Sequence, residues 1–208
     1  MPHRRLHIDT PAARIETLIE EPEGIPVGLA LVAHPHPLRG GTLDNKVAQT
    51  LARAALARGL VAVRPNFRGV GESSGEHDHG LGEADDMLAI IAAISPGFGY
   101  LPWTLLGFSF GAYVQQRVAT RLSAQGEPAN RLIMVGPAVS LYEFGPPVIP
   151  TYIIHGEDDE VIPLAAAQAY AQRYAIPIQV MPGTGHFFHG RLLELTALVD
   201  SGIGEGTP

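Results

Sequence analysis

The sequence contains no cysteine. This absence excludes a disulfide framework, a thiolate nucleophile and a zinc site built from cysteine ligands. Basic residues are also few, since Lys and Arg total 14 against 21 Asp and Glu, and the formal net charge is −7. Nucleic acids and anionic membrane surfaces are bound through basic faces, so we expect neither as a partner. Any catalytic nucleophile must be another residue type.

Long apolar segments are missing as well. No window approaches the roughly 20 residues that a membrane-spanning helix needs, and the basic start MPHRRLH has no apolar stretch behind it. We therefore expect a cytoplasmic protein without membrane contact, as a monomer or a weak homodimer. With 208 residues, 46% of them hydrophobic, the chain can bury one large core, so we expect a single domain over residues 1–208.

Short apolar runs bounded by Gly and Pro dominate what is present. Leu6–Asp9 and Arg14–Glu20 alternate apolar and polar side chains, which predicts two half-exposed antiparallel strands at one edge of a sheet. Six further segments predict more strands, most of them buried on both faces. These are Gly28–Ala33, Leu60–Phe67, Trp103–Phe108, Arg131–Val135, Thr151–His155 and Ile178–Met181.

Helical patterns separate most of these strands. We expect helices over Asp44–Arg58, Leu81–Ile94, Gly111–Val118, Pro163–Tyr174 and Phe188–Asp200. The alternation predicts an α/β fold with a mostly parallel, twisted sheet of about seven to eight strands and helices on both faces. Residues 138–150 are rich in Pro and Gly and show little helical pattern. We therefore expect no cap domain and an open site.

Ser109 lies at the corner between the strand Trp103–Phe108 and the helix that follows it. Gly107 and Gly111 stand two residues before and two residues after the serine, where we expect larger residues to crowd the serine side chain. The helix N-terminus provides free N–H groups beside any negative charge that develops on an attacked carbonyl oxygen. These features predict that Ser109 is a catalytic nucleophile.

The segment GFSFG in this context resembles the nucleophile elbow of the α/β-hydrolase fold. From Leu29 to Phe188 the chain is similar to small lidless α/β-hydrolases of the dienelactone-hydrolase-like and serine esterase group. The motifs that carry the similarity are HPHPLRGGT (34–42), NKV (45–47) and NFRGVG (66–71). The resemblance implies carboxylesterase activity on a small-molecule ester and leaves the physiological ester unnamed.

In this fold the triad residues follow the order serine, acid, histidine. The loop GEDDEVIP (156–163) offers four carboxylates, and Asp159 stands where the matching α/β-hydrolase loop carries its acid. Asp158 is the alternative, and Glu157 and Glu160 are expected to be solvated loop charges. For the base we expect His186, because Gly183 and Gly185 free its loop to bring the imidazole back over the sheet. His189 is the alternative base, although we expect it on the closing helix.

Two backbone N–H groups should form the oxyanion hole. One is that of Phe110, directly after the nucleophile, and the other comes from the loop HPHPL (34–38). Pro35 and Pro37 carry no N–H, which leaves His36, with Leu38 as second choice. The loop resembles the His-Gly-x-Pro loop of many α/β-hydrolases, with Pro35 in place of Gly.

The acyl pocket should be shallow because no lid covers it. Phe110, Tyr142, Phe144 and Phe187 are the apolar side chains expected to line it, so we predict a preference for short-chain, soluble esters. A thioesterase, a peptidase or an acyltransferase would use the same triad, and a binding protein would need only the fold.

A metal site is a further alternative. Two polar loops carry four imidazoles, His34, His36, His77 and His79, and such loops can bind zinc. No carboxylate set completes a site in the sequence, so we expect no metal and no other cofactor.

Overall fold

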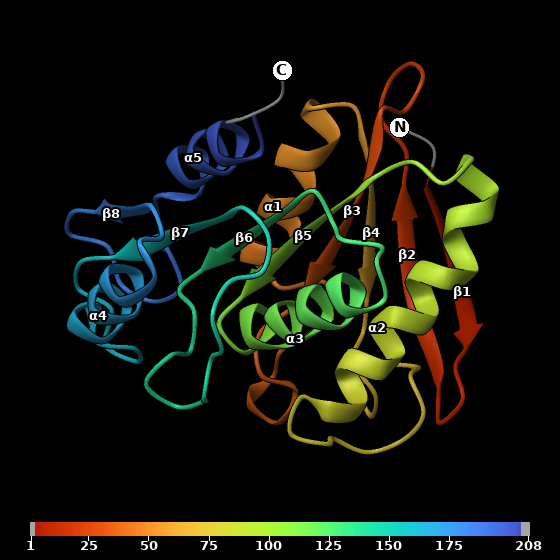
Figure 1. Ribbon diagram of the computed structural model, residues 1–208, viewed down its shortest axis with the longest axis horizontal. Helices are drawn as coiled ribbons and strands as arrows, with labels where there is room; N and C mark the ends of the chain where they lie inside the picture. The colour runs from red at the N-terminus through yellow and green to blue at the C-terminus, as the bar shows by residue number, and fades with distance from the viewer. Residues whose placement is uncertain (1–2, 205–208) are drawn as a thin grey trace.

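The computed structural model describes residues 3–204, which form one eight-stranded sheet between two layers of helices (Figure 1). The strands are β1 (His3–Asp9), β2 (Arg14–Glu20), β3 (Gly28–Ala33), β4 (Leu60–Pro65), β5 (Trp103–Phe108), β6 (Arg131–Val135), β7 (Thr151–Gly156) and β8 (Ile178–Met181). The helices are α1 (Lys46–Ala57), α2 (Leu81–Ile94), α3 (Phe110–Ala124), α4 (Leu164–Tyr174) and α5 (Leu192–Gly204).

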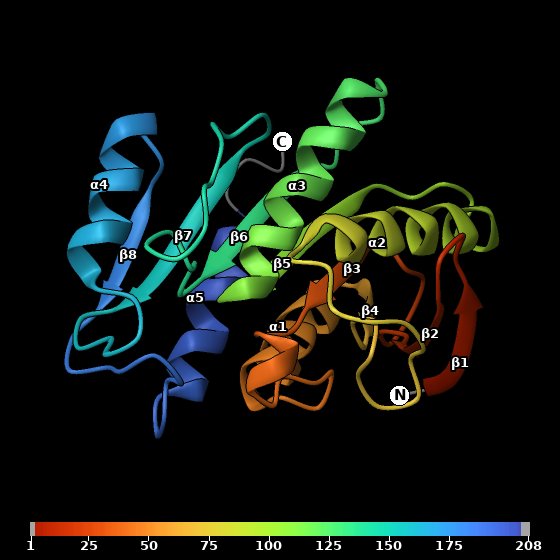
Figure 2. The same cartoon turned by 90° about the horizontal axis from the view of Figure 1, so that it is seen from below.

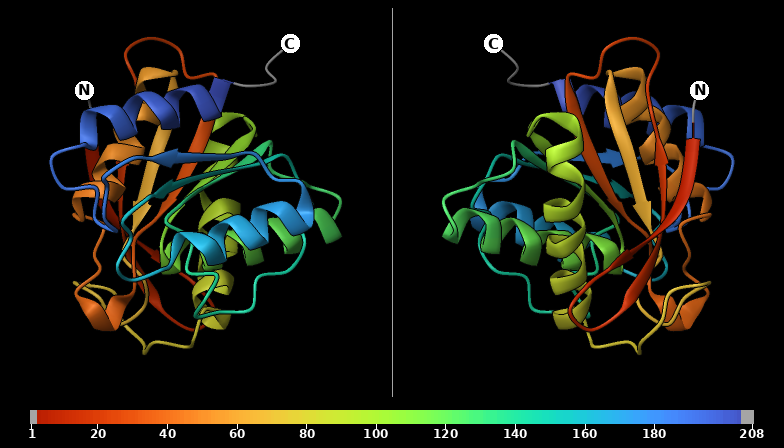
Figure 3. Two further views of the ribbon diagram at one scale, coloured as in Figure 1. Left: turned by 90° about the vertical axis from the view of Figure 1, so that its left-hand side faces the viewer. Right: turned by 90° about the vertical axis from the view of Figure 1, so that its right-hand side faces the viewer.

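The strand order across the sheet is β1-β2-β4-β3-β5-β6-β7-β8. β2 pairs antiparallel with both β1 and β4, and all other neighbours are parallel. Figure 3 shows the two edges of the twisted sheet, with β8 and α4 in blue at one edge and β1 in red at the other. This is the mostly parallel α/β sheet that the alternation of strands and helices predicts.

The helices divide between the two faces of the sheet (Figure 2). α2, α3 and α4 cover one face, while α1 and α5 pack together on the other. The segment 136–150, which joins β6 to β7, contains no helix, so nothing in it covers the site as a cap domain would. Within residues 3–204, none of the helices combines the length and the apolar character that crossing a membrane requires.

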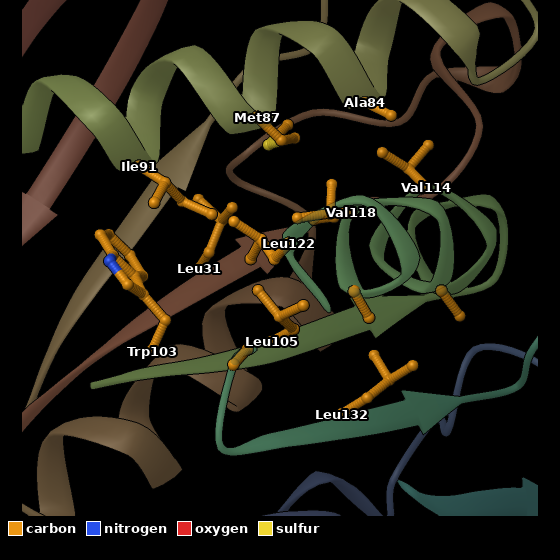
Figure 4. Packing of buried hydrophobic residues seen from close by; sticks show 14 of the residues in the cluster. Leu31, Ala84, Met87, Ile91, Trp103, Leu105, Val114, Val118, Leu122 and Leu132 are labelled. Carbon is orange, nitrogen blue, oxygen red and sulfur yellow. The ribbon is translucent and has the colours of Figure 1, made fainter. Parts of the chain in front are cut away.

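Figure 4 shows how the α2 and α3 face of the sheet is filled. Side chains of α2 (Met87, Ile91) and α3 (Val118, Leu122) point toward one another and down onto Leu105 of β5 and its neighbours. These side chains are at most 7% exposed, and burying each apolar side chain contributes about 1.5–3 kcal/mol. The continuous apolar runs of the sequence therefore become strands covered on both faces.

Two expectations about these elements are wrong. β2 is buried rather than half-exposed, because it lies inside the sheet between β1 and β4, and even its polar residues Glu16 and Thr17 are at most 1% exposed. The closing helix begins at Leu192 rather than Phe188, because Phe188 and Gly190 adopt positive φ angles of 53° and 74° that interrupt a right-handed helix.

Candidate active site

The nucleophile candidate Ser109 lies between the carboxyl end of β5 and the first residue of α3. Its backbone has φ 56° and ψ −115°, a strained conformation for a residue with a side chain. A Cβ atom on Gly107 would lie 2.5 Å from the carbonyl oxygen of Gly111, and one on Gly111 would lie 2.2 Å from that of Ala33. The glycines are therefore required by close backbone contacts rather than by crowding of the serine side chain.

Three predicted side chains lie in one hydrogen-bonded row. Nε2 of His186 is 3.0 Å from Oγ of Ser109, and Nδ1 of the same ring is 2.7 Å from Oδ2 of Asp159. All three residues are less than 9% exposed. Ser109, Asp159 and His186 follow β5, β7 and β8 respectively, so the carboxyl ends of these parallel strands bring them together. The row has the connectivity of a serine, histidine and aspartate triad.

The carboxylate of Asp159 is held at both oxygens. Oδ1 accepts the backbone N–H groups of Val161 and Ile162 at 2.9 and 2.7 Å, while Oδ2 faces His186. Burial alone would raise the pKa of Asp159, but the hydrogen bonds from His186, Ile162 and Val161 lower it below its ordinary value. Asp159 therefore stays ionised. The alternative acid, Asp158, is exposed, and its backbone N–H donates to the carbonyl oxygen of Thr184.

The other two acids of this loop hold the histidine loop. Glu160 accepts the backbone N–H of His186 at 3.2 Å, and Glu157 accepts that of Gly183 at 3.0 Å. They are exposed, as expected of loop charges, but they are not merely solvated. The alternative base, His189, is exposed in a turn before α5 and not on the helix, and no bond joins it to Ser109 within the described residues.

Beneath the row lies His155, the penultimate residue of β7, which is fully buried. Its Nε2 is 2.9 Å from the carbonyl oxygen of Ile162 and 3.4 Å from Oδ2 of Asp159. Burial lowers the pKa of His155, so the ring is neutral and donates from Nε2 to the carbonyl. Sequence reasoning did not find this residue, whose only signal is an imidazole at the end of a buried strand.

His36 and Phe110, whose backbone N–H groups are predicted to form the oxyanion hole, line the same cavity as Ser109. The N–H of Phe110 is the first of α3 and has no intrahelical acceptor. The N–H of His36 has no acceptor among residues 3–204. The second choice, Leu38, is different, because its N–H donates to Nδ1 of His36 at 3.2 Å. His36 is therefore the better placed of the two loop residues.

His34 ties this loop to the neighbouring strand. Its Nε2 accepts the backbone N–H of Phe67 at 2.9 Å, and its Nδ1 donates to the carbonyl oxygen of Pro35 at 2.7 Å. Burial lowers the pKa of His34 to about 3. Both ring nitrogens are occupied by backbone groups, so His34 has no lone pair left for a metal ion.

His77 packs behind the oxyanion residues. Its ring centroid lies 4.9 Å from that of His36 and 5.4 Å from that of Phe110. Its Nδ1 is 2.7 Å from Oε1 of the fully buried Glu83, which also accepts the N–H groups of residues 78 and 80. The imidazoles of these loops thus have packing and hydrogen-bonding roles. Within the described part of the chain, no group of three or more His, Asp or Glu side chains is arranged to hold a metal.

A small cavity of about 120 Å³ opens at Ser109. It is lined by Pro35, His36, Arg39, Gly40, Gly41, Asn45, Ser109, Phe110, Ala138, Leu141, Tyr142, Val161, His186 and Phe187. Sequence reasoning missed Arg39, Asn45, Leu141 and Val161, because their motifs and loops give no sign of which residues line the cavity. A larger hollow of about 620 Å³ adjoins Trp103, at the opposite end of β5 from the serine, so the smaller cavity is the candidate substrate site.

Of the side chains predicted to line the pocket, Phe110, Tyr142 and Phe187 do so. Phe144 does not. Its ring is buried in the core, 5.4 Å from that of Tyr113 and 5.6 Å from that of Tyr170. Tyr142 and Phe144 both contact the ring of Tyr113 on α3, but Tyr142 also lines the cavity at Ser109, whereas Phe144 packs on toward Tyr170 of α4.

Comparison with known proteins places this geometry in a family. The chain is 38% identical to an α/β serine hydrolase homologue from Coxiella burnetii, with a TM-score of 0.87 over 95% of this chain and 96% of that one. It is 32% identical to an α/β serine hydrolase without a lid from Xanthomonas campestris, with a TM-score of 0.89 over 97% and 93% of the two chains. An uncharacterized protein of Rickettsia prowazekii is 29% identical over 94% of this chain and 87% of its own length.

The profile of the Thioesterase domain family matches residues 48–143, a range that contains the β5 to α3 turn with Ser109. Together with the two structural relatives, the open sheet and the elbow serine define the class. The chain belongs to the lidless α/β serine hydrolases, and its fold is the α/β-hydrolase fold without a cap domain.

Proposed function

We propose that this protein is a carboxylesterase-type serine hydrolase that cleaves short-chain, soluble esters through Ser109, His186 and Asp159. The observation that carries the proposal is the continuous row of hydrogen bonds from Asp159 through His186 to a serine in a strained elbow. A serine hydroxyl is a weak nucleophile on its own, and a histidine held by a carboxylate is the group that activates it.

The proposed first step is acylation. Ser109 Oγ attacks the ester carbonyl while Nε2 of His186, 3.0 Å away, takes its proton. The imidazolium that forms is stabilised by the ionised Asp159 on its other side. The oxyanion accepts the N–H groups of Phe110 and His36. His186 then gives its proton to the leaving alcohol oxygen as the C–O bond breaks, and an acyl-serine remains.

Deacylation repeats these roles with water as the nucleophile. His186 takes a proton from the water, whose oxygen attacks the acyl carbonyl, and the oxyanion again accepts the N–H groups of Phe110 and His36. The C–O bond to Ser109 breaks, and Oγ regains the proton from His186. The free acid leaves and the enzyme returns to its first state.

The cavity supports short acyl groups. Its volume of about 120 Å³ is well below the roughly 300–1,000 Å³ of pockets that enclose drug-sized ligands. The loop 136–150 adds no cap over it, so atoms beyond a few acyl carbons extend into water. A long chain would gain little burial on binding.

Thioester hydrolysis is the second candidate, and the match of residues 48–143 to the Thioesterase domain family favours it. The same nucleophile, base and N–H groups serve both reactions, because the acyl-serine is common to them. The oxygen ester p-nitrophenyl butyrate and the thioester S-(p-nitrophenyl) thiobutyrate differ only in the atom, oxygen or sulfur, through which the leaving group is attached. A higher kcat/KM for the oxygen ester, relative to the uncatalysed rates of the two compounds, supports the esterase, and the opposite ranking supports the thioesterase.

The triad is tested with Ser109→Ala, His186→Ala and the double variant on p-nitrophenyl butyrate. Each single variant should lose about 10³–10⁶-fold in kcat, and the double variant should be little worse, because triad members act as a unit. Additive losses would contradict the shared role. Retained turnover in Ser109→Ala would remove the nucleophile assignment.

A further inference from the structure

One cationic residue, the exposed Arg39, borders the catalytic cavity. Arg39 is the last residue of the short 3₁₀ helix Pro37–Arg39 and lines the cavity together with Ser109 and His186. None of the other cavity-lining residues is Asp, Glu or Lys. Arg39 is thus the lining residue that carries a fixed positive charge, in a chain with a net charge of −7.

Arg39 is also unusual among the arginines. The side chain of each of the other twelve forms a hydrogen bond, an ion pair or a cation–π contact in residues 3–204, whereas the side chain of Arg39 forms none there. The carboxylate of Asp44, the first acid after Arg39 along the chain, lies 3.7 Å from Arg5. The guanidinium of Arg39, with five donors in a planar fork, therefore lacks a partner inside the described chain.

A second donor lines the same cavity. Asn45 is the N-cap of α1, and its Oδ1 accepts the N–H groups of Val47 and Ala48 at 2.9 and 3.3 Å. This engagement fixes the amide so that its oxygen faces the helix and its NH₂ group is left over. No acceptor for that NH₂ group occurs within residues 3–204. Two residues with unpaired N–H donors, Arg39 and Asn45, thus line the cavity.

The charge of Arg39 also reaches the aromatic wall of the cavity. Burial raises the pKa of Tyr142, and the positive charge of Arg39 is the first influence that opposes this rise. Tyr142 lines the cavity as well. An anion bound beside Tyr142 would therefore lie within the field of the guanidinium.

We propose that Arg39, assisted by the Asn45 amide, binds an anionic group of the substrate. This inference rests on the proposed ester or thioester hydrolysis and names its substrate class, a short ester or thioester with a carboxylate or phosphate near the reacting carbonyl. The anion must lie close to the reacting carbonyl, because Arg39 and Ser109 line the same cavity of about 120 Å³. A planar guanidinium can bind a carboxylate or a phosphate through two parallel N–H···O hydrogen bonds.

The test compares kcat/KM for anionic esters with that for neutral esters of the same size, after subtraction of spontaneous hydrolysis. Mono-p-nitrophenyl glutarate against p-nitrophenyl pentanoate places the carboxylate on the acyl side. On the leaving-group side, 4-acetoxybenzoate and 4-acetoxyphenyl phosphate are each compared with 4-acetoxybenzamide. The pair with the largest ratio identifies the position and the kind of anion. Wild type should prefer the anionic member of that pair by about tenfold at low salt, the size of one charged hydrogen-bond contact.

The variants decide whether Arg39 causes the preference. In Arg39→Gln the ratio should fall to about 1, while Arg39→Lys should keep part of it because the charge remains without the fork. Lys46→Gln is the matched control, since Lys46 is exposed, lies one residue beyond Asn45 and does not line the cavity. It should keep the full ratio. Asn45→Ser, which retains a helix-capping oxygen, should lower the ratio by less than Arg39→Gln.

The outcomes separate this inference from the proposed function. If wild type hydrolyses the neutral esters in a Ser109-dependent way but shows no anion preference in any pair, the role of Arg39 is wrong and the esterase stands. An equal loss of the ratio in Lys46→Gln and Arg39→Gln would reduce the effect to general charge attraction and also overturn the proposal. Absence of turnover on every ester and thioester would overturn the proposed function itself.

Discussion

The backbone N–H of Phe67 donates to Nε2 of His34 across 2.9 Å, joining the loop after β3 to the chain that follows β4. The same ring donates from Nδ1 to the carbonyl oxygen of Pro35. His34 is fully buried and precedes His36, whose N–H we assign to the oxyanion hole. The position of that N–H therefore depends on a neutral imidazole.

Acid should weaken the fold through His34. Burial lowers its pKa from 6.5 to about 3, so below pH 6.5 the unfolded chain binds a proton that the folded chain does not. The stability is fully present above pH 6.5 and is lost progressively as the pH falls toward 3. By pH 5 the loss from this residue should be about 2 kcal/mol, measured as the free energy of urea unfolding.

Two histidine variants, one of them a control, test this effect. His34→Gln should be less stable than wild type at neutral pH, but its free energy of unfolding should change less between pH 7 and 5. The exposed His189→Gln should keep the wild-type slope. Some slope should remain in His34→Gln, because burial also lowers the pKa of His155. An unchanged slope in His34→Gln would show that the ring does not titrate as described.

Asp159→Asn should lower kcat by about 10³–10⁴-fold with little change in folding. An asparagine has one acceptor oxygen, whereas the carboxylate uses Oδ1 for Val161 and Ile162 and Oδ2 for His186. Its NH₂ group would face His186 and favour the wrong tautomer. Asp158→Asn, on an exposed neighbour, should stay within a few fold of wild type in the same ester assay. The opposite ranking would move the acid to Asp158.

Gly111→Ala should destabilise the protein by about 1–3 kcal/mol, because its Cβ would lie 2.2 Å from the carbonyl oxygen of Ala33 and the backbone must shift. Gly97→Ala is the matched control, since nothing lies within 4 Å of the added atom. Denaturant unfolding of the two variants gives the comparison. Equal stabilities of the two variants would mean that the backbone at the elbow can move away from the added Cβ at no cost, which would contradict the close contact with Ala33.

Activity on p-nitrophenyl esters should be highest at about two to six acyl carbons and decline beyond, with no activation at a lipid interface. Each added methylene contributes roughly 0.8 kcal/mol only while it contacts a wall, and the cavity is small. Phe187 and Leu141 at its mouth are 42% and 57% exposed and offer only an open rim. A series from acetate to palmitate measures this, and a maximum at about ten carbons or more would reveal a deeper channel than the structure contains.

Most of the fold could be predicted from the sequence, because its strands are short apolar runs ended by Gly or Pro. The run Trp103–Phe108 is an example, since it ends where Ser109 needs the turn. The start of α5 could not be predicted, because the positive φ of Phe188 arises from the turn around it rather than from its own preference. β2 is buried because it pairs with β4 inside the sheet, and the alternation of apolar and polar residues within one segment does not show which strands will be its neighbours.

The residues proposed for the triad were accessible because their order along the chain and their position after strands follow from the fold. The cavity wall was less accessible. Phe144 and Tyr142 are two residues apart in one loop, and only the structure shows that the first packs in the core while the second lines the cavity. Arg39 was overlooked for a related reason, since nothing in a polar loop segment shows that one of its exposed charged residues also lines a cavity.

Labelling with a fluorophosphonate probe measures whether Ser109 is an activated nucleophile. We expect one covalent adduct per chain, located on Ser109 by peptide mass spectrometry. The adduct should be absent in Ser109→Ala and strongly slowed in His186→Ala, both of which should keep the circular dichroism of wild type. Absence of labelling in folded wild-type protein, or an adduct that persists in Ser109→Ala, would show that Ser109 is not the nucleophile.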